Sequence, residues 1–135
     1  MRISRRILEL VADHARQSAP QECCGILLYT NDDLSIVNSA ILAENIDKEN
    51  PENGYVLDHK AHLKALEMEI SGDGCIAGYY HSHPAGRARP SHRDLEQAIE
   101  GVTYLITGMA DGRIEHAAWR FDGDELVPEP IEMGE

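Results

Sequence analysis

Residues 75–84, CIAGYYHSHP, form an apolar run that ends in two histidines and a proline. This composition predicts a buried strand that stops at Pro84, because proline cannot donate a hydrogen bond within a sheet. Side chains alternate between the two faces of a strand, so His81 and His83 are expected to point the same way. The segment therefore predicts a sheet with two imidazoles on one face of a strand end.

A polar loop follows Pro84, and Ser91 then begins a predicted helix with Asp94 in its first turn. A carboxylate there can return to the strand end and share one ion with the two histidines. Two histidines and one carboxylate leave an open position on a tetrahedral zinc ion, as in catalytic sites. Ser-x-x-Asp is also a form of capping box, so Ser91 and Asp94 could serve only to start the helix. The histidines could likewise be satisfied by backbone partners.

Taken together, His-Ser-His-Pro followed by Ser-x-x-Asp resembles the JAMM motif of MPN-domain metallopeptidases. That family also carries an upstream glutamate in a stretch similar to Pro-x-Glu-x-Cys-Gly, and residues 20–25 here read PQECCG. The resemblance covers nearly the whole chain. It implies the MPN fold, which is JAB-like and similar to that of cytidine deaminases.

The resemblance also implies a role for each motif residue. His81, His83 and Asp94 would bind one zinc ion per chain. Glu22 would be the general base that takes a proton from the attacking water and passes it to the leaving amine. Ser91 would stabilise the oxyanion of the tetrahedral intermediate, since a hydroxyl aimed at developing charge is an ordinary oxyanion donor.

Members of the family cleave peptide or isopeptide bonds, many of them at the C-terminal glycine of ubiquitin or a ubiquitin-like protein. This short chain resembles the small prokaryotic members, which implies a substrate with a flexible Gly-Gly tail, such as a ubiquitin-like or sulfur-carrier protein. A metal-free MPN scaffold that acts as a binding module stays open, as does a zinc peptidase acting on other small peptides. A zinc deaminase needs His-x-Glu and Cys-x-x-Cys, whereas this chain has His83 at the third position and no Cys-x-x-Cys.

The rest of the chain predicts an α+β fold in a single domain, residues 1–135, with a mostly antiparallel sheet flanked by helices. Helices are predicted at 4–17, 58–70 and 91–100, with Ser4 and Asp58 as N-caps. Strands are predicted at 22–29, 34–42, 55–57, 75–82, 102–109, 113–121 and 125–131. A surface loop is expected at 44–54. The apolar face of the second helix is expected to consist largely of Leu63, Leu66, Met68 and Ile70.

Charge, apolar content and cysteine count indicate which classes of partner and which cell compartment to expect. A formal net charge of −12 argues against a nucleic-acid binder, which needs a basic face. The apolar runs are too short for a membrane span, and the N-terminal segment lacks the continuous apolar core of a signal peptide. Three cysteines, Cys23, Cys24 and Cys75, predict reduced thiols in the cytoplasm. Arg87 and Arg89 could contact substrate or serve solubility alone.

Overall fold

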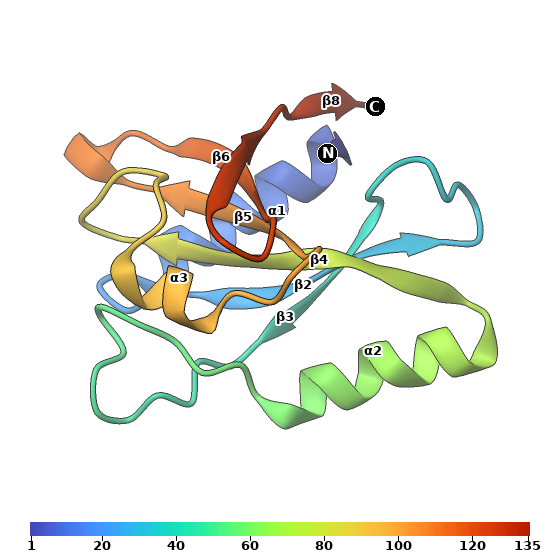
Figure 1. The fold of residues 1–135 in the computed structure, drawn as a ribbon, viewed down its shortest axis with the longest axis horizontal. Helices are drawn as coiled ribbons and strands as arrows, with labels where there is room; N and C mark the ends of the chain where they lie inside the picture. The colour runs from blue at the N-terminus through green and yellow to red at the C-terminus, as the bar shows by residue number, and fades with distance from the viewer.

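In the computed structural model, which describes residues 1–135, six strands form one mixed sheet in the order β3-β2-β4-β5-β6-β7 (Figure 1). All neighbouring strands are antiparallel except β4 and β5, which are parallel. The strands are β2 (Cys24–Thr30), β3 (Ser39–Ala43), β4 (Gly74–His83), β5 (Thr103–Gly108), β6 (Glu115–Phe121) and β7 (Leu126–Glu129). The predicted α+β class with a mostly antiparallel sheet is confirmed.

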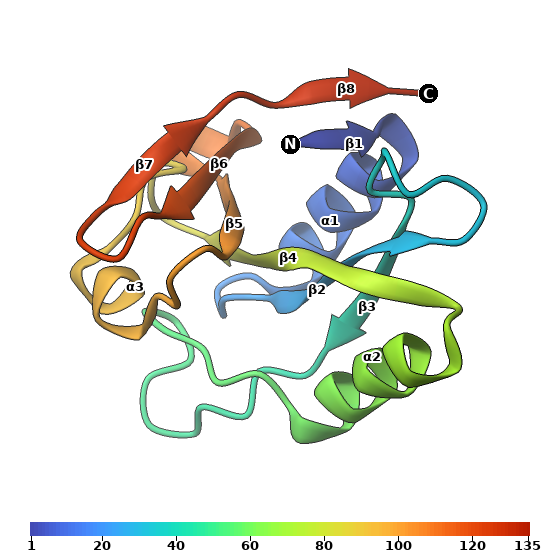
Figure 2. The same ribbon diagram turned by 45° about the vertical axis from the view of Figure 1, so that its right-hand side comes forward.

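Three helices accompany the sheet: α1 (Arg5–Ser18), α2 (His59–Ser71) and α3 (His92–Gln97). Helices α1 and α2 cover opposite faces of the sheet, and α3 lies near the end of β4 that carries the two histidines (Figure 2). A short 3-10 helix, η1 (Ala110–Gly112), joins β5 to β6. None of the helices is both long and apolar enough to cross a membrane.

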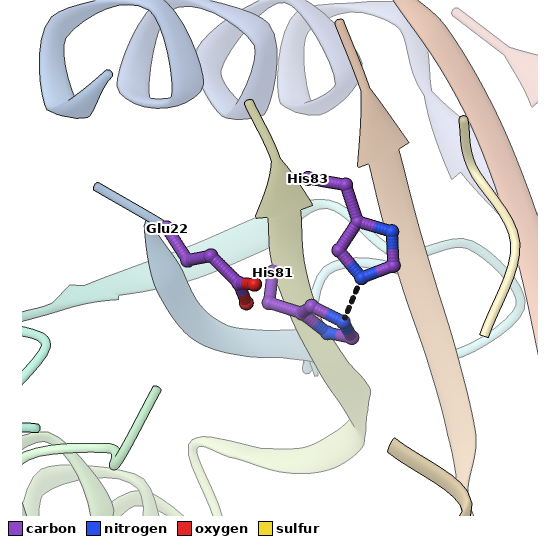
Figure 3. Close-up of side chains that lie close together, drawn as sticks. All are labelled: Glu22, His81 and His83. Carbon is purple, nitrogen blue, oxygen red and sulfur yellow. Dashed lines mark hydrogen bonds between the residues drawn. The ribbon is translucent and has the colours of Figure 1, made fainter. Parts of the chain in front are cut away.

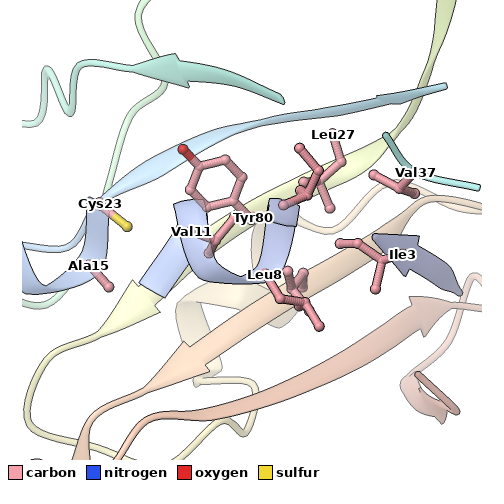
Figure 4. Close-up of a cluster of buried hydrophobic side chains, with 10 residues drawn as sticks. Ile3, Leu8, Val11, Ala15, Cys23, Leu27, Val37 and Tyr80 are labelled. Carbon is pink, nitrogen blue, oxygen red and sulfur yellow. The ribbon is translucent and has the colours of Figure 1, made fainter. Parts of the chain in front are cut away.

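Strand β2 is buried on both faces, and its alternating side chains divide between two cores. Cys23 and Leu27 point toward α1 and pack in a cluster with Val11 and Tyr80 (Figure 4). Cys24, Ile26 and Leu28 point the other way, toward α2. The predicted core positions of Cys23 and Cys24 on opposite faces are thereby confirmed, and all three cysteines are free thiols.

Both chain ends differ from the prediction. Ser4 precedes α1 but makes no side-chain capping bond, and it is also the last residue of a short strand, β1 (Arg2–Ser4). This strand pairs in parallel with β8 (Glu132–Gly134) at the other end of the chain. The last predicted strand, 125–131, is shorter in the structure: β7 ends at Glu129, and β8 begins beyond the predicted range.

Three predicted segments between β2 and β5 need correction. The strand expected at 34–42 is confined to β3, although its hairpin with β2 is confirmed. Residues 55–57 make only one isolated bridge, between Asn45 and Leu57, and not a strand. The helix at 91–100 ends at Gln97. In each case the predicted element was longer than the segment that makes regular backbone hydrogen bonds in the structure.

Helix α2 has its predicted N-cap, since Asp58 accepts a hydrogen bond from the backbone N–H of Lys60. Its predicted apolar face is confirmed only at Met68 and is wrong for Leu63, Leu66 and Ile70. The residues that pack on the sheet are Ala61 and Ala65, with Met68 beside them. Leu63, Leu66 and Ile70 are exposed by 59%, 41% and 88%. Small side chains bring the helix backbone close to the sheet, and the leucines are left facing outward.

Candidate metal centre

The end of β4 brings His81 and His83 together. β4 lies between β2 and β5, and His81 pairs with Cys24 on one side and Ile106 on the other. Both imidazoles point to the same side of the strand, as the period of two requires (Figure 3). Their Nε2 atoms lie 3.2 Å apart, and His81 is only 1% exposed. Two nitrogen ligands therefore converge at a buried strand end.

Asp94 reaches the same point from α3. Its Oδ1 lies 3.1 Å from Nε2 of His81, and its Oδ2 lies 3.1 Å from Nε2 of His83. The capping box is also present: Ser91 Oγ accepts the Asp94 N–H at 3.1 Å, and Asp94 Oδ2 accepts the Ser91 N–H at 2.8 Å. Capping and approach to the histidines are therefore not alternatives here. The cap fixes the carboxylate in the position from which it faces both imidazoles.

The chemistry of these donors fits a cation. The carbonyl of Arg87 lies 2.9 Å from Nδ1 of His83. A carbonyl can only accept, so in the neutral ring this nitrogen carries the proton and Nε2 presents a lone pair. That lone pair faces the carboxylate of Asp94 and the other imidazole. Acceptor atoms gathered in this way repel one another unless positive charge lies between them, so His81, His83 and Asp94 form a set that suits a metal ion.

The pKa shifts reflect the same arrangement. Burial raises the pKa of Asp94, but its contacts with His81 and His83 outweigh this and hold the pKa well below its usual range. Burial lowers the pKa of His83, yet hydrogen bonds to Asp94 and to the Arg87 carbonyl raise it overall. Burial lowers the pKa of His81. The site thus keeps Asp94 ionised as a ligand-ready carboxylate.

Glu22 lies two residues before the start of β2, and its side chain lies close to His81 and His83. It is 6% exposed, and one carboxylate oxygen lies within 4.8 Å of ring nitrogens of both His81 and His83 (Figure 3). These three residues are a cluster that could bind a metal. Burial raises the pKa of Glu22 to about 7. The carboxyl group therefore changes protonation state near neutral pH.

The backbone of Glu22 is fixed by the loop between β3 and α2. Its N–H donates to the carbonyl of Pro51 at 2.8 Å, and its carbonyl accepts from Asn45 Nδ2 at 3.0 Å. Asn45 also donates to the Gly54 carbonyl and accepts from the Val56 N–H. A surface loop was expected here, and its tie to the candidate base was missed. The only signal was the Asn-x-Asp pattern of 45–47, which is typical of side chains that bond to nearby backbone.

Ser91 is exposed, and its Oγ accepts the capping bond described above. Together with Glu22, His83 and Gly86 it lines a cleft of about 250 Å³. The hydroxyl hydrogen is not used by the cap, so it can still be donated. The candidate oxyanion donor and the candidate base thus border one cleft.

Two residues of β6 hold the loop that follows His83. Arg87 makes a two-pronged ion pair with Glu115, at 3.0 and 2.8 Å, and Trp119 donates to the Ala88 carbonyl at 3.0 Å. A side chain at Gly108 would meet the backbone of Ala88 at 2.5 Å, so glycine is needed for this close approach. The ion pair of Arg87 with Glu115 thereby fixes the loop, and with it the Arg87 carbonyl that orients His83. The sequence did not predict this role of Arg87.

Known proteins resemble this chain over most of its length. Residues 4–122 match a family described as prokaryotic homologues of the JAB domain. The desampylase of Haloferax volcanii is 37% identical over 86% of this chain and 84% of its own. A probable TtuB-protein conjugate cleaving protease of Thermus thermophilus is 36% identical over 78% of this chain and 68% of its own. The CysO-cysteine peptidase of Mycobacterium tuberculosis is 28% identical over 96% and 88%.

Solved protein structures also resemble this chain over nearly its whole length. A protein from Desulfitobacterium hafniense superposes with a TM-score of 0.84 at 28% identity, covering 99% of this chain and 92% of that one. A JAB1/MPN domain protein from Archaeoglobus fulgidus, at 20% identity and covering 99% and 97%, shares the fold with a TM-score of 0.62. The fold expected from the motif is therefore confirmed, and the chain belongs to the family of prokaryotic homologues of the JAB domain.

Proposed function

We propose that this chain is a zinc-dependent peptidase or isopeptidase that cuts at the C-terminal Gly-Gly tail of a ubiquitin-like or sulfur-carrier protein. The observation that carries the proposal is the convergence of His81, His83 and Asp94, each 3.1–3.2 Å from the next. A buried glutamate, Glu22, lies beside them. All donors of the motif are present, which favours an enzyme over a metal-free scaffold.

His81, His83 and Asp94 would hold the zinc ion. The ion would supply Lewis-acid chemistry: it would lower the pKa of the attacking water to about 7 and polarise the scissile carbonyl. The Glu22 carboxylate accepts a proton from the attacking water and delivers it to the nitrogen of the leaving amine. A pKa raised to about 7 suits a group that first accepts and then releases a proton. The Ser91 hydroxyl donates to the oxyanion.

The substrate class rests on the relatives and on the shape of the site. One relative is named for cleaving TtuB–protein conjugates and another as a CysO-cysteine peptidase. A cleft of about 250 Å³ beside His83 and Ser91 suits a thin extended tail without bulky side chains, such as Gly-Gly. The three free cysteines favour a cytoplasmic location, where thiols stay reduced.

The first test is metal content. Purified wild type should contain about one zinc per chain by elemental analysis, and His81→Ala should lose it. His92→Ala is a matched control, because the side chain of His92 is 86% exposed on α3 and pairs with Glu96. A wild type that takes up no zinc would contradict the proposal and favour the binding module. Iron in place of zinc would change the metal only, since such ligands also suit iron.

The second test is cleavage. A fusion of a ubiquitin-like carrier, ending in Gly-Gly, to a short C-terminal peptide should be cut after the second glycine, as mass spectrometry would show. Glu22→Gln should keep its zinc and lose at least a hundredfold in rate, because a general base contributes about that much. Cleavage of unrelated short peptides at the same rate would favour a peptidase of broader substrate class.

A further inference from the structure

Helix α2 carries two apolar stripes, and only one of them is used within the chain. Ala61, Ala65 and Met68 face the sheet. Leu63, Leu66 and Ile70 follow a second stripe of the same spacing, with His59 one turn earlier. At 100° per residue the two stripes lie on opposite sides of the helix. The exposed stripe therefore points directly away from the core, and α2 lies at the rim of the molecule in both views (Figures 1 and 2).

This exposure is not that of scattered surface residues. Leu63, Leu66 and Ile70 are 59%, 41% and 88% exposed, and they adjoin along one line of the helix. Other large apolar side chains are also exposed, namely Leu34, Leu42, Val56, Leu95, Ile99 and Met133, but none of them lies on α2. A contiguous apolar line on the surface marks an interaction site. Residues at i, i+3 and i+7 are also the spacing with which one helix packs along another.

The charges beside the stripe identify the occupant. Lys60 and Glu67 flank the same edge of the stripe, one heptad apart, and neither side chain has an ion-pair partner within the chain. In an antiparallel helix pair, residues on this edge of the two helices meet. Lys60 of one copy then lies against Glu67 of the other, and the two-fold axis repeats the contact. The surface is complementary to itself.

We propose that α2 is the interface of a homodimer in which two copies of the helix pack antiparallel. Leu63 of one copy packs against Leu66 of the partner subunit, and Ile70 packs against His59 of the partner subunit. The Lys60–Glu67 pairs close one edge of the seam. One helix of this length buries little area, so the dimer is weak, with a Kd on the order of 10–100 µM. This inference does not depend on the proposed function.

Sedimentation velocity over about 1 µM to about 500 µM tests the dimer, with the range set around the expected Kd. The wild type should pass from monomer to dimer, and Leu66→Glu should stay monomeric, because it places two charges in the seam. Leu34→Glu is the matched control, since Leu34 is also 60% exposed but lies in the turn between β2 and β3. A wild type that is monomeric throughout, or a dimer that survives Leu66→Glu, would overturn the proposal.

A charge exchange tests the antiparallel register. Lys60→Glu and Glu67→Lys should each raise the Kd about tenfold, because attraction becomes repulsion at both symmetric contacts. The double variant Lys60→Glu/Glu67→Lys should return to the wild-type Kd. Neither change harms the helix itself, since an acid near its start and a base near its end favour the helix dipole. A double variant as weak as the single ones would contradict this pairing.

Discussion

The ring of Tyr55 is stacked on the imidazole of His81, with centroids 4.7 Å apart and planes inclined by 27°. His81 Nδ1 is the one buried side-chain polar atom without a hydrogen-bond partner. Metal-binding histidines are usually oriented by a hydrogen bond from their second nitrogen. The Arg87 carbonyl accepts such a bond from Nδ1 of His83. Nδ1 of His81 has no such hydrogen bond, and the stacked ring of Tyr55 orients the imidazole instead.

Replacing this ring should weaken metal binding without unfolding the protein. We expect Tyr55→Leu to lower zinc affinity about tenfold, the lower end for loss of an orienting contact. Tyr55→Phe keeps the ring and should keep the affinity. Competition with a chromophoric chelator measures it. Tyr79→Leu is the control, because Tyr79 stacks on Tyr104 and not on His81; an equal loss there would make the effect one of general stability.

Tyr55 is itself held by Arg93 of α3. Arg93 Nη2 donates to the Asp47 carboxylate at 2.7 Å and to the Tyr55 carbonyl at 3.3 Å. The guanidinium contacts Gly54, where an added Cβ would stand 2.0 Å from Nη1. Asp47 is 9% exposed, so this pair is shielded from water on one side. The loop over the site and the helix that carries Asp94 are thereby joined.

Gly54→Ala should displace the guanidinium and cost about 1–2 kcal/mol of unfolding free energy, mainly through the weakened bonds to Asp47. Arg93→Gln should cost a similar amount. The double variant should cost little more than either one, because both changes remove the same interaction. Urea denaturation of the four proteins measures this; fully additive losses would mean that Gly54 acts through its own backbone and not through Arg93.

The buried Glu22 predicts a pH dependence of the metal-free protein. Its folded-state pKa of about 7 lies above its ordinary value of 4.5. A raised pKa means that the folded state is favoured fully below pH 4.5 and loses this advantage as pH rises through about 7. The loss approaches about 3 kcal/mol, at 1.36 kcal/mol per pKa unit.

Glu22→Gln isolates that contribution, because glutamine does not titrate. Between about pH 4.5 and pH 8 the unfolding free energy of the wild type should fall relative to that of the variant. Chemical denaturation in the presence of a chelator at each pH measures the difference. A difference that stays constant over this range would mean that the Glu22 carboxyl is as well solvated in the folded state as in the unfolded one.

Much of the site could be predicted from the sequence, since its residues lie in two short local patterns. The period of two places His81 and His83 on one face, and the capping pattern places Asp94 in a first helical turn. Glu22 was found only through the family resemblance, because no local rule connects it to residues almost sixty positions later. Tyr55, Asp47 and Arg93 were missed because their contacts depend on how an irregular loop folds back.

The fold was predictable where apolar patterns were strong and less so where two patterns compete. The nearly all-apolar run at 22–29 predicted the strand β2, and the structure divides its side chains between two cores. Helix α2 offers two stripes of equal period, one of alanines and one of larger side chains. Sequence reasoning chose the larger side chains for the core, whereas the structure buries the alanines.

That disagreement gives a prediction in which the sequence and the structure expect opposite results. Leu63→Ala should change the unfolding free energy by less than about 0.5 kcal/mol, because Leu63 is 59% exposed. Ala65→Leu should cost about 1–3 kcal/mol, because Ala65 is 0% exposed and an added side chain would push α2 from the sheet. Both are measured by denaturation at low protein concentration, where association does not contribute. If the leucine formed the packed face, Leu63→Ala would instead cost at least about 2 kcal/mol, and Ala65→Leu would be tolerated.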